Sequence, residues 1–226
     1  MLVQLASNVW KINEDSNLYI IKLDESKIGG KNSAKIASKS NSKAEKKSSK
    51  IIVIDSCPKQ YRKKVEEQFK QIADPRDVEV VLFTHFHYDH IGNFDMFANA
   101  KFYASEDEIT FFKKDGFGAV LNKKIADNFT EMLRENRLQE LGKIKKFLKD
   151  NGIGIFDVPG HTVGSVLYLY KRHKQDSILF SGDTYFGDSC YGRTDPPSSF
   201  AEKMPQTLKM LKNIPYNILC GGHDYV

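Results

Sequence analysis

One hexapeptide, His85-Phe-His-Tyr-Asp-His90, constrains this chain more than any other feature of its sequence. It follows the apolar, β-branched run Val78–Phe83, which predicts a buried strand that ends where the histidines begin. In an extended segment residues i and i+2 point to the same side, so His85 and His87 can reach a common point. Four nitrogen and oxygen donors within six residues are more than one tetrahedral ion conveniently takes from so short a segment. The spacing therefore predicts two metal ions at a strand-to-loop junction.

Three further side chains that can bind metal follow apolar runs elsewhere, each at a glycine-containing turn. They are His161 in Val158-Pro-Gly-His161, Asp183 in Leu179-Phe-Ser-Gly-Asp183 and His223 in Leu219-Cys-Gly-Gly-His223. Each one alone is more often a hydrogen-bonded structural residue or a turn former than a ligand. Together with the hexapeptide they use five of the six histidines, and donors at strand ends can converge on one edge of a sheet. We interpret the remaining histidine, His173, as an exposed turn residue.

The apolar pattern predicts two sheets with helices packed outside them, an α/β fold in a single domain over residues 1–226. Short β-branched runs predict strands at 18–23, 51–55, 78–83, 153–158, 166–170, 178–181 and 218–220. Helical spacing predicts a helix after Pro58, a mainly helical segment Glu106–Asp150 with a break near Gly116 and Gly118, and a helix over Ser199–Lys212 that the serine caps.

The formal net charge of +5 comes from one segment. Residues 26–50 hold eight lysines and one glutamate, whereas the rest of the chain carries 26 basic and 28 acidic residues. This Lys/Ser-rich, low-complexity insert is too polar to bury a core, so we expect an expanded, solvated connection between two strands. The alternative is an electrostatic tether for RNA or another acidic partner, although no aromatic residue is interleaved for base stacking.

The sequence has no feature of a secreted or membrane protein. No apolar run approaches the ~20 residues that span a bilayer. The first residues, MLVQLASNVWKI, lack the basic start and unbroken apolar segment of a signal peptide. The cysteines, Cys57, Cys190 and Cys220, are odd in number and far apart, which favours a reducing compartment over a disulfide framework. We therefore expect a cytoplasmic protein that acts on a small molecule, and the sequence carries no signal for its oligomeric state.

As a set, four motifs resemble those of the metallo-β-lactamase-fold superfamily: His85-x-His-x-Asp-His90, Gly160-His161-Thr, Gly182-Asp183-Thr and Gly222-His223. The resemblance implies a four-layered αββα sandwich with two ions. It implies that His85, His87 and His161 hold one ion, that Asp89, His90 and His223 hold the second, and that Asp183 bridges them. Asp55 looks like an aspartate that supports the ligands in this family, and its alternative interpretation is a strand-end cap.

Two divalent ions, zinc or else iron or manganese, supply hydroxide at neutral pH because they lower the pKa of water from ~15.7 to ~7. On this interpretation Asp183 and Asp89 are the catalytic carboxylates, and Asp89 receives the proton of the water. Gly182-Asp-Thr-Tyr-Phe186 and Gly222-His-Asp-Tyr225 resemble segments of the glyoxalase II-like group, whose members hydrolyse thioesters such as hydroxyacylglutathione. This likeness places Arg193 and Tyr225 at the substrate.

The sequence departs from that group after its last histidine. Only three residues follow His223, so we expect the helical glutathione-binding domain of the larger glyoxalase II enzymes to be absent. The motifs also resemble persulfide dioxygenases, which bind a single iron at His85, His161 and Asp183. A third interpretation is an RNA-processing nuclease of the same fold. For Arg193 the alternative to substrate contact is a salt bridge with Asp195 that shapes the loop.

Overall fold

The first of two β-sheets has seven strands that neighbour one another in chain order. A computed structural model describes residues 1–23, 50–173, 176–188 and 190–224. The strands are β1 (Leu2–Ala6), β2 (Val9–Glu14), β3 (Ser16–Lys22), β4 (Ile51–Ile54), β5 (Val78–Leu82), β6 (Lys101–Ala104) and β7 (Leu138–Glu140). Pairing is antiparallel from β1 to β4 and parallel from β4 to β7.

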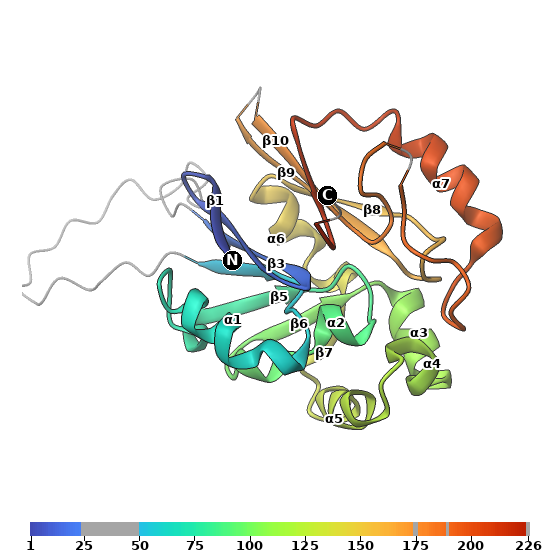
Figure 1. Cartoon of the computed structure of the whole chain (residues 1–226), viewed down its shortest axis with the longest axis horizontal. Coiled ribbons are helices and arrows are strands. Elements are labelled where there is room, and N and C mark those ends of the chain that lie inside the picture. Colours follow the sequence, from blue (N-terminus) through green and yellow to red (C-terminus); the bar gives the residue numbers. More distant parts are fainter. Residues whose placement is uncertain (24–49, 174–175, 189, 225–226) are drawn as a thin grey trace, which may run out of the picture.

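The second sheet has four strands in the order β11-β10-β9-β8 and lies against the first (Figure 1). These strands are β8 (Ile153–Asp157), β9 (Val166–His173), β10 (Asp176–Gly182) and β11 (Ile218–Gly221). Pairing is antiparallel except between β10 and β11, which run parallel because helix α7 (Met204–Leu211) connects them. His173 is the last residue of β9, so its interpretation as a turn residue is wrong.

Helices cover the outer faces of both sheets. Below the first sheet in Figure 1 lie α1 (Arg62–Phe69), α2 (Tyr88–Ile91), α3 (Glu106–Lys114), α4 (Gly116–Val120) and α5 (Lys123–Arg134), while α6 (Lys145–Asp150) borders β8 and α7 flanks the second sheet. Short 3-10 turns occupy Lys59–Tyr61, Pro75–Asp77, Phe94–Met96, Leu141–Lys143 and Ala201–Lys203. No helix among the described residues is long and apolar enough to cross a membrane.

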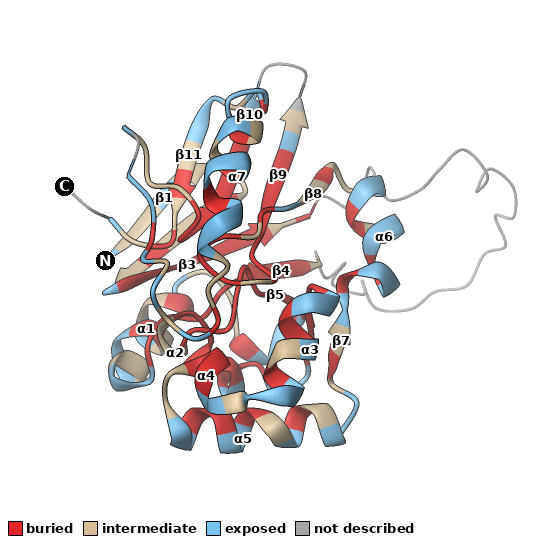
Figure 2. Cartoon of the chain, turned by 90° about the vertical axis from the view of Figure 1, so that its right-hand side faces the viewer, coloured by how far each residue is buried: buried red, intermediate tan, exposed pale blue. Residues whose placement is uncertain are grey.

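Side-chain alternation along the strands creates separate apolar layers. In β3, Leu18 and Ile20 pack in the core shared with the helices, whereas Tyr19 and Ile21 pack in the core between the two sheets. A third cluster joins β9 and β10 to α7 on the far side of the second sheet. Figure 2 shows buried strands in the middle and exposed outer faces on α6 and α7. The expected four-layered αββα sandwich is confirmed.

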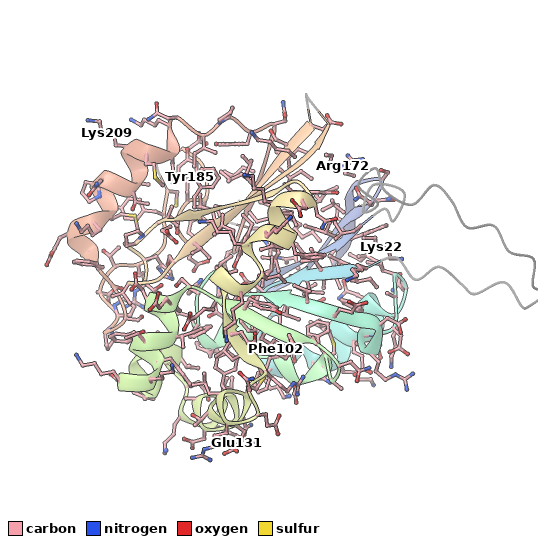
Figure 3. The ribbon with its side chains drawn as sticks, turned by 180° about the vertical axis from the view of Figure 1, so that it is seen from behind. Lys22, Phe102, Glu131, Arg172, Tyr185 and Lys209 are labelled. Atoms are coloured by element: carbon pink, nitrogen blue, oxygen red, sulfur yellow. The ribbon has the colours of Figure 1, made fainter. Side chains whose placement is uncertain are left out.

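The helix-side core of the first sheet rests on aromatic rings. Phe102 of β6 stacks on Phe83, with the ring centroids 5.8 Å apart, and Phe129 of α5 meets Phe83 edge to face at 5.6 Å. Figure 3 shows Phe102 between the sheet and the α5 layer, where Glu131 marks the outer surface. In the same view Tyr185 lies beside the second sheet, under the helix that carries Lys209. The outer layers therefore hold the sheets by apolar packing, and the strand ends stay available for a site.

Several predicted elements differ from the observed ones. The helix predicted from Ser199 begins at Met204, and Ser199 Oγ donates to the His161 carbonyl at 2.8 Å instead of capping it. By contrast, the break predicted near Gly116 and Gly118 is confirmed at Asp115, whose side chain accepts from Gly118 N at the start of α4. Sequence reasoning also missed the strands β1, β2, β6 and β7. These strands are short or mixed with polar residues, and their pairing is set by neighbours distant in the chain.

The predicted helix after Pro58 is confirmed as α1, with Val65 and Phe69 fully buried. The lysine-rich insert connects β3 and β4, which pair antiparallel with Lys22 opposite Ile51. Apart from its last residue, the insert lies outside the described residues, so its expected solvated form stays a prediction.

Candidate metal centre

The candidate ligands all follow strands that end at one edge of the sandwich. β4 and β5 run parallel in the first sheet, and β10 and β11 run parallel in the second, so their carboxyl ends point the same way within each sheet. The hexapeptide follows β5 and continues into α2, while His161 follows β8. Asp183 comes directly after β10, and His223 follows β11 after one glycine. The fold thus brings together residues that are up to 138 positions apart, because carboxyl ends of parallel strands meet at a common edge.

Three imidazoles form the first group of candidate ligands. His161 Nε2 lies 3.2 Å from His85 Nε2 and 3.0 Å from His87 Nδ1. All three side chains are buried. One ligand atom from each lies within 4.8 Å of the others, a triangle that one ion can occupy. We call this group the first half of the centre.

The second half of the centre combines a carboxylate with two imidazoles. His223 Nε2 lies 3.2 Å from Asp89 Oδ2, and His90 Nε2 lies 3.8 Å from the same oxygen. Ligand atoms of Asp89, His90 and His223 again lie within 4.8 Å of one another. This half is less buried than the first, since Asp89 and His223 retain side-chain exposures of 17% and 13%.

Asp183 lies between the two halves. Its Oδ2 is 3.6 Å from His161 Nε2 of the first half and 3.5 Å from His223 Nε2 of the second. Its Oδ1 is 3.2 Å from His90 Nε2. The carboxylate thus faces both sets of candidate ligands, and its role as the bridge between two ions stays a prediction.

Two atoms test whether this donor set fits metal ions. His90 Nε2 and Asp183 Oδ1 are buried and lie 3.2 Å apart, but the geometry between them is not that of a hydrogen bond and neither makes one to another described residue. Buried polar atoms are rarely left without a partner, and the pattern of three ring nitrogens converging at about 3 Å is typical of ligands around a cation. The residues therefore fit two divalent ions held by imidazole and carboxylate donors.

Glycine at the turns lets the chain come this close. A Cβ on Gly222 would lie 2.1 Å from Asp183 Oδ1 and 2.7 Å from His90 Cε1, so only glycine leaves room for the ligands. Gly182 has a φ of +50°, and a Cβ there would lie 2.7 Å from Thr84. These two glycines explain why Asp183 and His223 are both preceded by glycine in the sequence.

Comparison with known proteins agrees with this geometry. A sequence profile of the Metallo-beta-lactamase superfamily matches residues 46–223. The chain belongs to the metallo-beta-lactamase superfamily. It is 30% identical to a probable metallo-hydrolase of Methanocaldococcus jannaschii, over 77% of this chain and 72% of that protein. It is 28% identical to a hydroxyacylglutathione hydrolase of Buchnera aphidicola, over 77% of this chain and 57% of that enzyme's length.

A similar fold occurs in a protein crystallised in a di-iron-bound form, with a TM-score of 0.58 and 17% identity over 95% of this chain and 91% of that one. By its family, this chain is a metallo-hydrolase of the metallo-beta-lactamase superfamily, and its candidate ligand groups consist of histidine and aspartate.

In this superfamily member the outer ring nitrogen of each candidate ligand is hydrogen-bonded. His85 Nδ1 lies 3.0 Å from Thr84 Oγ1, His87 Nε2 lies 3.0 Å from Ser198 Oγ and His161 Nδ1 lies 2.7 Å from the Arg193 carbonyl. His90 Nδ1 lies 2.9 Å from Asp55 Oδ2, and His223 Nδ1 lies 2.9 Å from the Asp15 carbonyl. Such contacts orient the rings, so the inner nitrogen of each imidazole is the one that faces the centre.

Asp55 is connected to both halves of the centre. Its Oδ1 accepts from Thr84 N at 2.9 Å, and its Oδ2 accepts from Thr84 Oγ1 at 2.8 Å as well as from His90 Nδ1. Asp55 is 1% exposed and has a φ of 57°. Asp55 thus contacts one candidate ligand directly and the backbone at the strand end, and its predicted role as a support of metal ligands stays a prediction.

Burial and charge separate the two halves in the metal-free protein. Burial lowers the pKa of His85, His87 and His161, that of His87 to about 3. Burial also disfavours charge on His90 and His223, but nearby carboxylates outweigh it and raise both pKa values, that of His223 to about 10. Burial raises the pKa of Asp183, but its histidine neighbours outweigh burial and hold that pKa well below its usual range.

Sequence reasoning missed a buried glutamate that joins two ligand loops. Glu108 of α3 accepts from Phe86 N at 2.9 Å, between His85 and His87, and from Thr162 Oγ1 at 2.8 Å and Gly164 N at 3.1 Å beyond His161. Burial raises its pKa to about 7. An acidic residue in the first turn of a helix carries no sequence signal for this role, because helix starts commonly have one.

Sequence reasoning also missed Thr84, Ser198, Asp15 and Ser16, which contact the ligands through hydrogen bonds. Arg193 contributes its carbonyl, while its exposed guanidinium pairs with Asp195, Nε to Oδ1 at 2.9 Å. The predicted salt bridge is thus present. Tyr225, the other predicted substrate contact, lies outside the described residues.

Proposed function

We propose that this protein hydrolyses a thioester of a small molecule at a dinuclear metal centre. The observation that supports it most is the position of Asp183, whose carboxylate faces two complete sets of three ligands. The likeness to hydroxyacylglutathione hydrolases supports the substrate class, and those enzymes are longer than the matched region.

The first half of the centre and Asp183 would hold one ion, and the second half and Asp183 would hold the other. Bound there, divalent ions supply hydroxide at neutral pH and a positive charge beside the carbonyl oxygen. Zinc is the metal we propose, and iron or manganese suits the same donors. Asp89, the more exposed of the two catalytic carboxylates, is assigned to accept the proton of the attacking water.

The leaving group needs little help from the protein. A thiol of pKa ~8.5 departs as thiolate, so no dedicated acid is required. Cys57 and Cys220 are unsuited to act as nucleophiles, since both are buried and burial raises both pKa values, that of Cys220 to about 12. We assign Arg193 and Tyr225 to substrate contact, and the three free thiols support a cytoplasmic location.

Metal analysis combined with a thioester assay tests the function. The protein is purified without added metal, its ions are counted by plasma mass spectrometry, and thiol release is followed from hydroxyacylglutathione and from simpler acyl thioesters. We expect about two ions per chain and turnover that a chelator removes and zinc restores. A protein that holds two ions and cleaves none of these thioesters would refute the proposal.

Two other outcomes separate the alternatives. Close to one iron per chain, with oxygen uptake on a persulfide, would instead support a dioxygenase at His85, His161 and Asp183. Cleavage of RNA that is lost on deletion of residues 27–50 would support the nuclease.

A further inference from the structure

Asp15, between β2 and β3, and Ser16, the first residue of β3, contact two of the three ligands in the second half of the centre, and we call this pair the β2–β3 turn. The Asp15 carbonyl lies 2.9 Å from His223 Nδ1, and Ser16 Oγ donates to the Asp89 carbonyl at 2.7 Å. Both contacts join residues more than 70 positions apart in the chain. The turn therefore holds a ligand that follows β11 and a ligand that begins α2.

The turn is itself rigidly held. Asp15 has a φ of 72°, a left-handed conformation that other residues than glycine adopt rarely, and Ser16 is fully buried. Cys57 Sγ donates to the Ser16 carbonyl at 3.2 Å, and Asn17 N donates to the Gly222 carbonyl at 2.7 Å, directly before His223. A non-glycine residue in this conformation persists only where its surroundings determine it.

The first half of the centre is supported from other parts of the fold. His87 contacts Ser198, His161 contacts the Arg193 carbonyl, and His85 contacts Thr84. Two different scaffolds thus hold the two halves: the loop at 193–198 for the first half and the β2–β3 turn for the second. Asp55 is connected to both halves, because it contacts His90 of the second half and Thr84, which contacts His85 of the first.

We propose that the β2–β3 turn is a positioning element for the second ion alone, acting through the Asp15 carbonyl and the Ser16 hydroxyl. The proposal rests on the dinuclear centre of the proposed function. Removing the Ser16 hydroxyl takes away the hydrogen bond that it donates to the Asp89 carbonyl. We expect the Asp89 carboxylate then to be held less firmly beside His223. Contacts that orient metal ligands commonly change metal affinity by about 10–100-fold when they are removed.

Stepwise zinc binding to matched variants tests the proposal. Ser16→Ala removes the hydroxyl that contacts Asp89 of the second half, and Ser198→Ala removes the hydroxyl that contacts His87 of the first half. Zinc is titrated against a chromophoric chelator into each metal-free protein to obtain two dissociation constants. We expect Ser16→Ala to weaken the second ion by about 10–100-fold and the first by less than about twofold. Ser198→Ala is expected to show the reverse pattern.

Two controls test whether the loss of affinity is merely structural. One is the free energy of unfolding of each metal-free variant, and the other is one further variant. Thr130→Ala, on α5 and away from the candidate ligands, loses a hydroxyl that donates to the Ala126 carbonyl at 2.9 Å, and it should retain wild-type affinity at both sites. Equal weakening of both ions by Ser16→Ala, or unchanged affinity for the second ion, would overturn the proposal. If the wild-type protein itself binds fewer than two zinc ions, the dinuclear centre fails and the positioning role fails with it.

Discussion

The two halves of the centre are built from similar residues but hold different charge. In the first half three buried imidazoles face one another, and burial lowers their pKa values, so they are neutral before an ion arrives. In the second half His90 and His223 lie beside Asp89 and Asp183, and these carboxylates raise the pKa values of both histidines. An ion entering the first half displaces no proton, whereas an ion entering the second must displace protons.

This contrast follows from where the carboxylates lie. Asp183 Oδ1 is 3.2 Å from His90 Nε2, and Asp89 Oδ2 is 3.2 Å from His223 Nε2. In the first half the shortest contact with a carboxylate is 3.6 Å, from His161 Nε2 to Asp183 Oδ2, while the imidazoles face one another at 3.0–3.2 Å. Burial disfavours protonation in both halves, and only in the second do the carboxylates outweigh it, so the first half is neutral and the second is ionic.

The largest effect should come from removing the residue that joins the halves. Asp183→Ala is expected to lower kcat/KM by about 10³-fold or more and to reduce bound metal below two ions per chain, because both ligand sets lose a donor. Thioester assay and metal analysis measure this. Asp176→Ala, at the exposed start of the same strand, is the matched control and should change neither value. Full activity in Asp183→Ala would exclude a bridged centre.

A pH series sharpens the comparison between the halves. The raised pKa values mean that the second half binds protons at neutral pH, and these protons compete with the metal. Affinity for the second ion should therefore fall as pH falls, by about 10–100-fold per unit between pH 8 and 6 for one or two displaced protons. The pKa values of the first half are lowered, so affinity for the first ion should change little above pH 6.5.

Calorimetry in buffers of different ionisation enthalpy measures the protons released at each step. Equal release by the two ions would contradict the assigned charge difference between the halves.

Substitution of Asp55, which is connected to both halves, should have a smaller effect, and this effect should weaken the binding of both ions. Asp55→Asn places an amide where Asp55 Oδ2 accepts from Thr84 Oγ1 and His90 Nδ1. We expect both dissociation constants for zinc to rise, each by about 10–100-fold, unlike the one-sided pattern of Ser16→Ala. The same chelator titration measures it. Loss of affinity for only one ion would show that Asp55 supports a single half.

Some of this protein could be predicted from sequence because the signal was local. The hexapeptide places four donors within six residues, and the nearly continuous apolar runs of β3 and β4 mark strands buried on both faces. The likeness of the motifs to one superfamily then supplied the αββα order. The start of α7 was missed because the serine expected to cap it instead hydrogen-bonds the His161 carbonyl, a partner 38 residues away.

By itself the sequence determined which residues can bind metal and that the excess positive charge lies in one insert. Only the tertiary structure decided which nitrogen of each histidine faces the centre, and which half of the centre is neutral. The Asp15 carbonyl, Ser198 and the Arg193 carbonyl carry no signal as supports of ligands, because any residue has a carbonyl and serine occurs everywhere on surfaces. Their roles arise from strand pairing that brings distant segments within 3 Å, and pairing between distant segments is a property of the whole fold.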